Sequence, residues 1–134
     1  MKLSVIVVSF DMQRELPRTL QSLARDYQEG AMNLDYEVLL IDNGSPNPPT
    51  PELWSSLNLP LRYFAMEGSS AAPAAAINRG LAEAAWEIIC LMVDGAHILT
   101  PGVFRAALSC YRGFENPVVA VRYFYLGNEE QPVS

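Results

Sequence analysis

Hydrophobic residues in this chain fall into short β-branched runs, separated by stretches in which apolar positions recur at helical spacing. The runs Leu3 to Ser9 and Tyr36 to Ile41 are nearly all apolar, as strands are when both faces of a sheet are covered. The run from Ile88 to Val93 has the same character and stops at Asp94, so we expect it to be a central strand. The predicted strands cover residues 3–9, 36–41, 61–65, 88–93 and 118–125.

The stretches between these runs predict helices. Apolar residues recur at every third or fourth position from 16 to 27, which gives one buried stripe. An alanine-rich stretch follows residue 69, with Ile77 and Leu81 on its expected inner face. Thr100 and Pro101 are typical of the N-cap and first position of a further helix. The predicted helices cover residues 15–27, 52–57, 69–86 and 102–111.

Alternation of strands and helices predicts an α/β fold with three layers, α/β/α, around a mostly parallel, Rossmann-like sheet. In a doubly wound order the first strand lies beside the strand that ends at Asp94. The carboxyl ends of the first, second and fourth strands then converge on one crevice. We expect a single domain over residues 1–126 and a polar, mobile tail over 127–134.

Composition narrows the classes of function. The formal charge is −6, from 9 basic and 15 acidic residues, and no basic run exists, which disfavours nucleic acid as a partner. Cys90 and Cys110 sit inside apolar patterns, so we expect reduced core cysteines in a cytoplasmic protein. Neither a signal peptide nor an apolar stretch of membrane-spanning length is found, so no membrane insertion is expected.

Several nucleotide-binding and hydrolytic motifs are missing. The turn after the first strand, Ser9 to Gln13, contains no glycine, which disfavours a dinucleotide fold. A P-loop and a Gly-x-Ser-x-Gly elbow are absent, and His97, the single histidine, has no nucleophile partner in the sequence. What remains is a set of acidic and amide side chains at the predicted strand ends.

Each of these side chains also has a purely structural explanation. Asp42 is suited to an Asx turn, Asn78 and Arg79 to exposed helix positions, and Asp94 to capping the segment that follows. Taken singly, the structural explanation is at least as good as the functional one. Their predicted convergence at neighbouring strand ends favours a functional site.

Five motifs, in order along the chain, resemble family 2 inverting glycosyltransferases with the GT-A fold. SVIVVSFD at residues 4–11, LPRTLQSL at 16–23 and EVLLIDNGS at 37–45 are similar to the opening of that family. AINRGL at residues 76–81 is similar to its Ala-x-Asn-x-Gly-Leu helix. DGAHILTPG, at 94–102, takes the place of its Asp-x-Asp metal motif. The resemblance extends from about Leu3 to Val121.

The resemblance implies that the crevice binds a nucleoside diphosphate sugar. Asp42 and Asn43, with the end of the first strand, would contact the base and ribose, while Asn78 and Arg79 would lie near the phosphates or sugar. Asp94 would lie beside the diphosphate. The implied binding residues are Val8, Ser9, Phe10, Asp42, Asn43, Asn78, Arg79 and Asp94.

The metal motif departs from the family pattern. In the family it holds Mn²⁺ or Mg²⁺, which take oxygen ligands and neutralise the leaving diphosphate. Here Ala96 replaces the second carboxylate, leaving Asp94 as the candidate ligand and His97 as a further one, although a solvent-facing loop residue explains His97 better. The resemblance therefore implies a divalent cation that this sequence only partly supports.

The catalytic base that the family uses would lie beyond the predicted fifth strand. The chain stops at Ser134, where that region would begin, and Glu129 and Glu130 in the tail are not credible bases. Two alternatives follow. The chain is the donor-binding part of a glycosyltransferase, apparently truncated at its C-terminal end, or it is a non-catalytic module that binds a nucleotide sugar. The acceptor is unknown. An exposed fifth strand would favour pairing into a homodimer.

Overall fold

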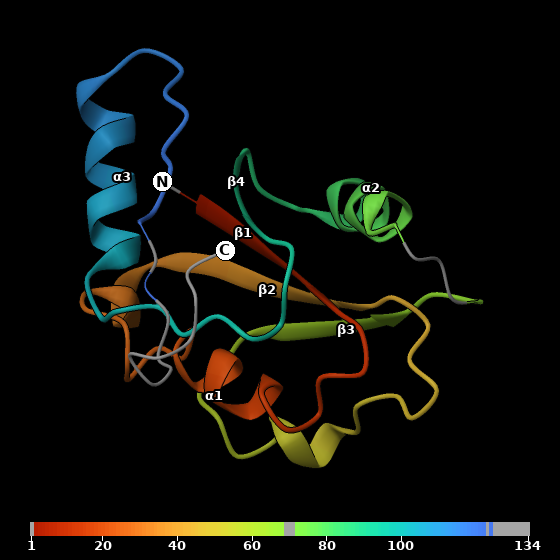
Figure 1. The fold of residues 1–134 in the computed structure, drawn as a ribbon. Coiled ribbons are helices and arrows are strands. Elements are labelled where there is room, and N and C mark those ends of the chain that lie inside the picture. Colours follow the sequence, from red (N-terminus) through yellow and green to blue (C-terminus); the bar gives the residue numbers. More distant parts are fainter. Residues whose placement is uncertain (1, 69–71, 123, 125–134) are drawn as a thin grey trace.

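Four parallel strands form the centre of the protein. The computed structural model describes residues 2–68, 72–122 and 124, and its sheet has the order β3-β2-β1-β4 (Figure 1). The strands are β1 (Lys2–Ser9), β2 (Asp35–Asp42), β3 (Leu61–Ala65) and β4 (Ile88–Met92). β1 pairs with β2 on one side and with β4 on the other. The expected parallel α/β sheet is confirmed, and so is the reversal of strand order at β1.

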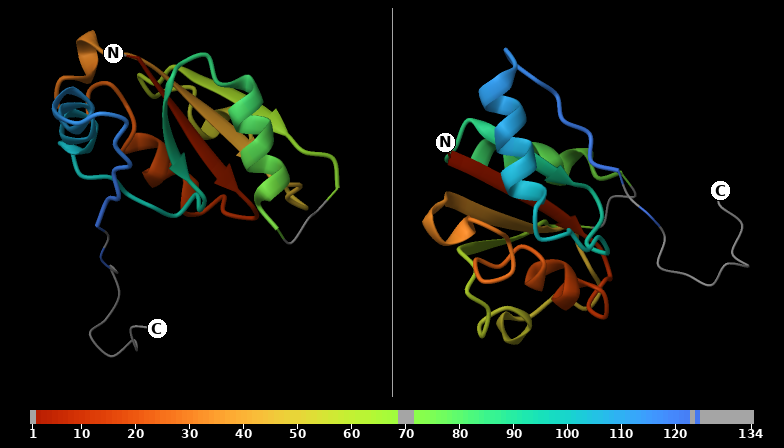
Figure 2. Two further views of the ribbon diagram at one scale, coloured as in Figure 1. Left: turned by 90° about the horizontal axis from the view of Figure 1, so that it is seen from above. Right: turned by 90° about the vertical axis from the view of Figure 1, so that its left-hand side faces the viewer.

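Helices cover both faces of the sheet, which gives the three expected layers (Figure 2). The helices α1 (Leu16–Gln21) and α3 (Val103–Gly113) lie on one face, and α2 (Ala74–Glu83) lies on the other. The larger core fills the α1/α3 face and includes Leu20, Val38 and Phe104. The core beneath α2 is smaller and is centred on Ile6 and Leu39.

β4 is an edge strand among the described residues, so the expectation of a central strand covered on both faces is wrong. Its residues are mostly half-buried, and Leu91 is 45% exposed. An apolar run shows that a strand is hydrophobic but not how many neighbours it has. Cys90 on this strand and Cys110 on α3 are free and half-buried, and burial raises the pKa of the Cys90 thiol to about 11, which suits the expected structural role.

The first helix is shorter than predicted. α1 ends at Gln21, and residues 22–28 form turns, because the Ser22 hydroxyl bonds back to the Thr19 carbonyl and later amides take shorter-range partners such as Leu20. The predicted helix over 52–57 is reduced to the 3₁₀ turn η2 (Pro51–Leu53), and a second 3₁₀ turn, η1 (Ala31–Asn33), was not predicted.

α2 packs on the sheet through small residues. Ala76 and Gly80 are its buried positions, whereas Leu81, predicted to face inward, is exposed. A Cβ on Gly80 would lie only 2.5 Å from Cγ2 of Ile6, so the helix backbone rests directly on β1. Larger residues at positions 76 and 80 would lift the helix from the sheet.

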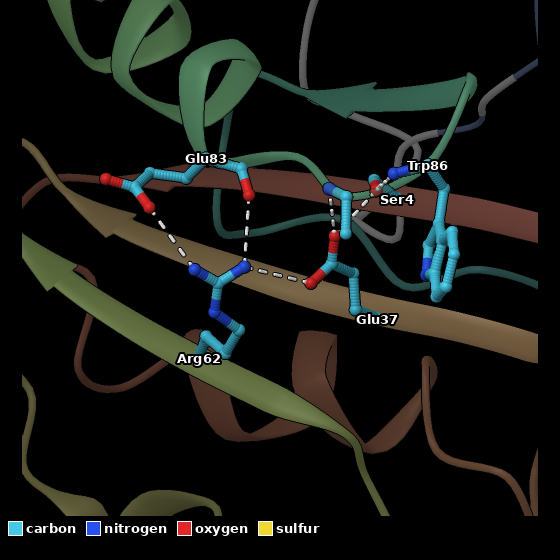
Figure 3. Close-up of polar contacts among 6 residues, drawn as sticks. Ser4, Glu37, Arg62, Glu83 and Trp86 are labelled. Carbon is cyan, nitrogen blue, oxygen red and sulfur yellow. Dashed lines mark hydrogen bonds and ion pairs between the residues drawn. The ribbon is translucent and has the colours of Figure 1, made fainter.

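A charged cluster fastens the end of α2 to the sheet (Figure 3). Glu37 Oε1 accepts hydrogen bonds from the Ser4 hydroxyl at 2.8 Å and from the Ala85 amide at 2.7 Å, and Oε2 pairs with Arg62 at 3.1 Å. The Trp86 amide donates to the Ser4 hydroxyl. These five residues are called the Glu37 cluster below. They join β1, β2 and β3 to the turn between α2 and β4.

The predicted fifth strand is not formed by its described residues, 118–122 and 124. Residues 117–122 carry no strand, and Val118 is almost fully exposed. Positions 123 and 125, and the predicted tail over 127–134, lie outside the described residues. A β-branched run becomes a strand only when another strand supplies its backbone hydrogen bonds. No helix in the described part of the chain is long and apolar enough to cross a membrane.

Candidate functional site

The carboxyl ends of β1, β2 and β4 meet at one edge of the sheet. Ser9 and Asp42 are paired in register, and the Asn43 amide donates to the Ser9 carbonyl at 2.8 Å. Val8 and Ser9 are buried, while the next side chain, Phe10, is 43% exposed. The convergence expected from the sequence is therefore confirmed for β1 and β2.

Asp42 is buried, and both of its oxygens are used by one neighbour. The Ser45 amide donates to Oδ2 at 3.0 Å, and the Ser45 hydroxyl donates to Oδ1. The same hydroxyl accepts from the Asp11 amide at 2.8 Å, which ties the loops after β1 and β2 together. Burial, and then the Asp42 carboxylate, raises the pKa of Tyr63 on β3. Asp42 thus shapes the loop after β2, as its structural explanation expected, although it bonds the amide three residues on and not two as in an Asx turn.

Asp94 lies directly beyond β4, beside the end of β1. A Cβ on Gly95 would lie 3.1 Å from Cβ of Ser9, so the two segments pass at van der Waals distance. Asp94 is half-buried, its Oδ1 accepts from the Ala96 amide at 3.0 Å, and its carbonyl lies 3.1 Å from Nδ1 of His97. The third predicted strand end therefore joins the other two.

Asn78 and Arg79 lie on the exposed side of α2. The Arg79 guanidinium pairs with Glu83 at 3.0 Å and lies 5.0 Å from the centre of the Phe64 ring. These contacts place Arg79 beside β3 and engage it in a surface ion pair, whereas the three strand ends gather Ser9, Asp42 and Asp94.

The described residues do not form a metal site by themselves. They contain no group of three His, Cys, Asp or Glu side chains arranged to hold an ion. Asp94 contributes one carboxylate with one oxygen already bonded, Ala96 offers no side-chain ligand, and the exposed His97 points a ring nitrogen at the Asp94 carbonyl. This donor set falls short of what Mg²⁺ or Mn²⁺ requires from protein ligands alone.

Sequence reasoning missed the loop residues that line an open pocket of about 510 Å³ next to Asp42 and Ser45. The Gln13 amide bridges the two loops of this pocket by donating to the Asn47 carbonyl. The topology could have identified these residues, because the loops that follow the paired strands β1 and β2 must lie side by side. The lining residues are Asp11, Gln13, Arg14, Glu15 and Asn47.

Comparison with known families identifies the protein family of this chain. The sequence model of Glycosyl transferase family 2 matches residues 4–128, which is nearly the whole chain. The chain belongs to glycosyltransferase family 2. The resemblance seen in the five motifs is thereby confirmed, and the parallel sheet with strand order 3-2-1-4 is that family's GT-A fold.

Solved structures agree with the family 2 fold. S. aureus TarS matches with a TM-score of 0.73 and 23% identity over 84% of this chain and 20% of TarS. TarS 1–349 in complex with UDP-GlcNAc has a TM-score of 0.70, and the complex with UDP 0.73, each at 23% identity over 84% of this chain and 32% of that one. This chain thus spans a third or less of these neighbours. A comparison with curated proteins finds no match.

Proposed function

We propose that this family 2 domain binds a nucleoside diphosphate sugar at the edge where β1, β2 and β4 end. The convergence of Ser9, Asp42 and Asp94 at that edge carries the proposal, because open α/β sheets bind ligands outside the carboxyl ends of their strands where the order reverses. TarS, a neighbour of the same fold, binds UDP-GlcNAc and UDP, which makes uridine nucleotides the first ligands to test.

The proposed contacts divide between two parts of the donor. The nucleoside would lie against the ends of β1 and β2, where the exposed Phe10 ring offers a stacking surface for a base. The diphosphate and sugar would lie toward Asp94, and Asn78 and Arg79 would have to reach them from the side of β3, where Arg79 lies near Phe64. Arg79 would first have to leave Glu83. The residues proposed to bind are Val8, Ser9, Phe10, Asp42, Asn43, Asn78, Arg79 and Asp94.

A divalent cation is proposed only as an aid to donor binding. A carboxylate and a diphosphate repel each other at close range unless positive charge lies between them. Asp94 would be the protein ligand of such an ion and His97 a weaker second one, while the remaining ligands would come from the diphosphate and water. The protein's own donors do not suffice, so we assign no catalytic step to an ion.

Transfer of the sugar to an acceptor hydroxyl with inversion is proposed for a chain that also holds a general base and an acceptor site. Glu129 and Glu130 lie outside the described residues, and we assign neither a role. The second candidate function, binding without transfer, is favoured by Ala96, which removes one carboxylate from the metal motif.

Calorimetric titration with UDP-GlcNAc, and with GDP- and dTDP-sugars, each with and without Mn²⁺, tests the proposal. We expect saturable, base-selective binding that is lost in Asp42→Ala and in Asp94→Ala. Asp35→Ala is the matched control, because Asp35 is exposed at the opposite end of β2. No binding by the folded wild-type protein would overturn the proposal. Release of free sugar or transfer to an added acceptor would separate the enzyme from the binding module.

Two further expectations stay proposals. Pairing between copies was predicted through a fifth strand, and since its described residues carry no strand, the edges left for pairing in the described sheet are β3 and β4. Sedimentation at high concentration tests this, and a monomer there would count against it. A cytoplasmic location also stays a proposal, and localisation of a tagged chain in cells would test it.

A further inference from the structure

A row of buried, neutral side chains faces the loop that follows Asp94. Thr19, Ser22 and Gln28, called the Thr19 cluster below, are 3% exposed or less. The Thr19 hydroxyl donates to the Gly95 carbonyl at 2.6 Å, and the Ser22 hydroxyl accepts from the Leu99 amide at 3.1 Å. The loop forms neither helix nor strand, so its backbone amides and carbonyls have no regular hydrogen-bond partners. These side chains provide partners for the Gly95 carbonyl and the Leu99 amide.

The same segment continues to hold the chain as far as α3. The Gln28 amide group donates to the Thr100 carbonyl at 3.0 Å, and its oxygen accepts from the Phe104 amide at 3.4 Å. The Glu29 amide donates to the Pro101 carbonyl at 2.7 Å. α1 and the turns after it therefore hold residues 95–104 through hydrogen bonds at successive positions.

Thr19 acts closest to the proposed donor site. Its bond is made to the carbonyl of the residue directly after Asp94, and on the other side Gly95 is in close contact with Ser9. β4 fixes the backbone before Asp94, and Thr19 with Ser9 fixes the backbone after it. A buried hydroxyl is costly unless it is bonded, so a threonine in this apolar layer specifies one position of the loop.

We propose that Thr19 is a positioning residue, which sets the Asp94 carboxylate for the diphosphate end of the donor, while Ser22 and Gln28 hold the rest of the loop. This inference rests on the proposed function. It differs from a purely structural role in a measurable way, because a positioning residue affects the diphosphate part of a ligand more than its nucleoside part.

The test compares UDP with UMP on wild type, Thr19→Val and Thr19→Ser. Valine has nearly the same shape and lacks the hydroxyl, whereas serine keeps it. We expect Thr19→Val to weaken UDP binding about tenfold, the factor for one lost buried hydrogen bond, with UMP binding changed little and with recovery in Thr19→Ser. Equal losses for UDP and UMP, or no recovery in Thr19→Ser, would overturn the proposal.

A ligand-free measurement separates failure of this inference from failure of the proposed function. Amide hydrogen exchange at Ala96, whose amide bonds to Asp94, is expected to become about tenfold faster in Thr19→Val and to return in Thr19→Ser, while Val38 in β2 is unaffected. Unchanged exchange at Ala96 overturns the positioning role even if nucleotides bind. If the wild type binds neither UDP nor UMP, the proposed function fails, and the exchange result still decides how the loop is held. Should Thr19→Val not fold, Ser22→Ala is measured in the same way at Leu99.

Discussion

Two polar clusters lie on opposite faces of the sheet, and they are built from different chemistry. The Glu37 cluster, on the α2 face, uses a carboxylate and a guanidinium to join β1, β2 and β3 to the turn after α2 (Figure 3). The Thr19 cluster, on the α1/α3 face, is neutral, and half of its side-chain hydrogen bonds go to the backbone of the loop after Asp94.

The difference follows from what each cluster has to hold. The α2 face has the smaller apolar core, so charge-assisted hydrogen bonds contribute more to fastening its single helix. The α1/α3 face has an ample core, but an irregular segment crosses it and leaves backbone groups to satisfy. On the α2 face the charged groups stabilise the packing of a helix. On the α1/α3 face the neutral hydrogen bonds fix the conformation of a loop at the proposed site.

The largest expected effect comes from removing the charge of the Glu37 cluster. Glu37→Ala leaves the Ser4 hydroxyl and the Ala85 amide without their acceptor, and we expect the free energy of unfolding to fall by about 3 kcal/mol. Urea unfolding measures this. Arg62→Met, which removes only a half-exposed partner, is the control and should cost less. If Glu37→Ala lowered the free energy of unfolding by less than about 1 kcal/mol, the charged cluster would not have the stabilising role that distinguishes it from the neutral one.

The next effect tests whether close packing holds α2 as firmly as the cluster does. Gly80→Ala places a Cβ against Ile6, and overpacking of this kind is expected to destabilise the protein by about 2 kcal/mol. Thermal unfolding measures the change. Gly113→Ala is a useful control, because a Cβ at that position meets nothing within 4 Å. A smaller cost of Gly80→Ala in an Ile6→Ala background, which lacks the γ carbons that the new Cβ would meet, would confirm that the crowded pair is the cause.

A smaller effect is expected from the neutral cluster. Gln28→Leu removes the bonds to Thr100 and Phe104 while keeping an apolar side chain of similar length, and we expect a loss of about 1.5 kcal/mol. Hydrogen exchange should show faster exchange at Phe104 and little change in β2. A uniform change across both regions would mean that the cluster supports the whole fold and not the loop.

The smallest effect is a dependence of stability on pH, which of the two clusters only the charged one can produce. Burial raises the pKa of Glu37, but hydrogen bonds from the Ala85 amide, Ser4 and Arg62 outweigh it, and the net pKa lies below its ordinary value of 4.5. The folded state therefore binds fewer protons, and this stability is present above about pH 4.5 and is lost as pH falls through the folded pKa. Urea unfolding from pH 7 to 3 should show a shallower loss in Glu37→Gln than in wild type. Gln28→Leu should leave the slope unchanged.

Local pattern predicted most of the elements in this chain. The boundaries of β3 were predicted to the residue, and those of β1, β2 and β4 to within one, because each is a short apolar run ended by turn residues. Among the proposed site residues, Ser9, Asp42 and Asp94 could be found because strand ends and topology bring them together. Thr19 and Gln28 could not be found, since nothing local marks a polar residue on a helical stripe as the partner of a loop about 75 positions away.

The failed predictions for β4 and for the fifth strand have one physical source. The β4 run was expected to be covered on both faces, and residues 118–125 were expected to form a strand. Hydrophobicity records that burial would be favourable, but a partner must be present to bury a residue or to complete a ladder. Leu81 was misplaced for a related reason. The side of α2 that faces the sheet is the one that allows close approach to Ile6, so Gly80 faces inward and Leu81 is exposed.

The sequence by itself determined the alternating α/β order, the parallel sheet, the family and the acidic residues at the strand ends, because all of these depend on periodicity and on motifs within about ten residues. Only the tertiary structure decided that β4 is an edge, that Ser45 joins the loops after β1 and β2, and that Thr19 holds Gly95. Those features depend on which distant backbone groups require a hydrogen-bond partner. That requirement arises only when segments far apart in the sequence pack together.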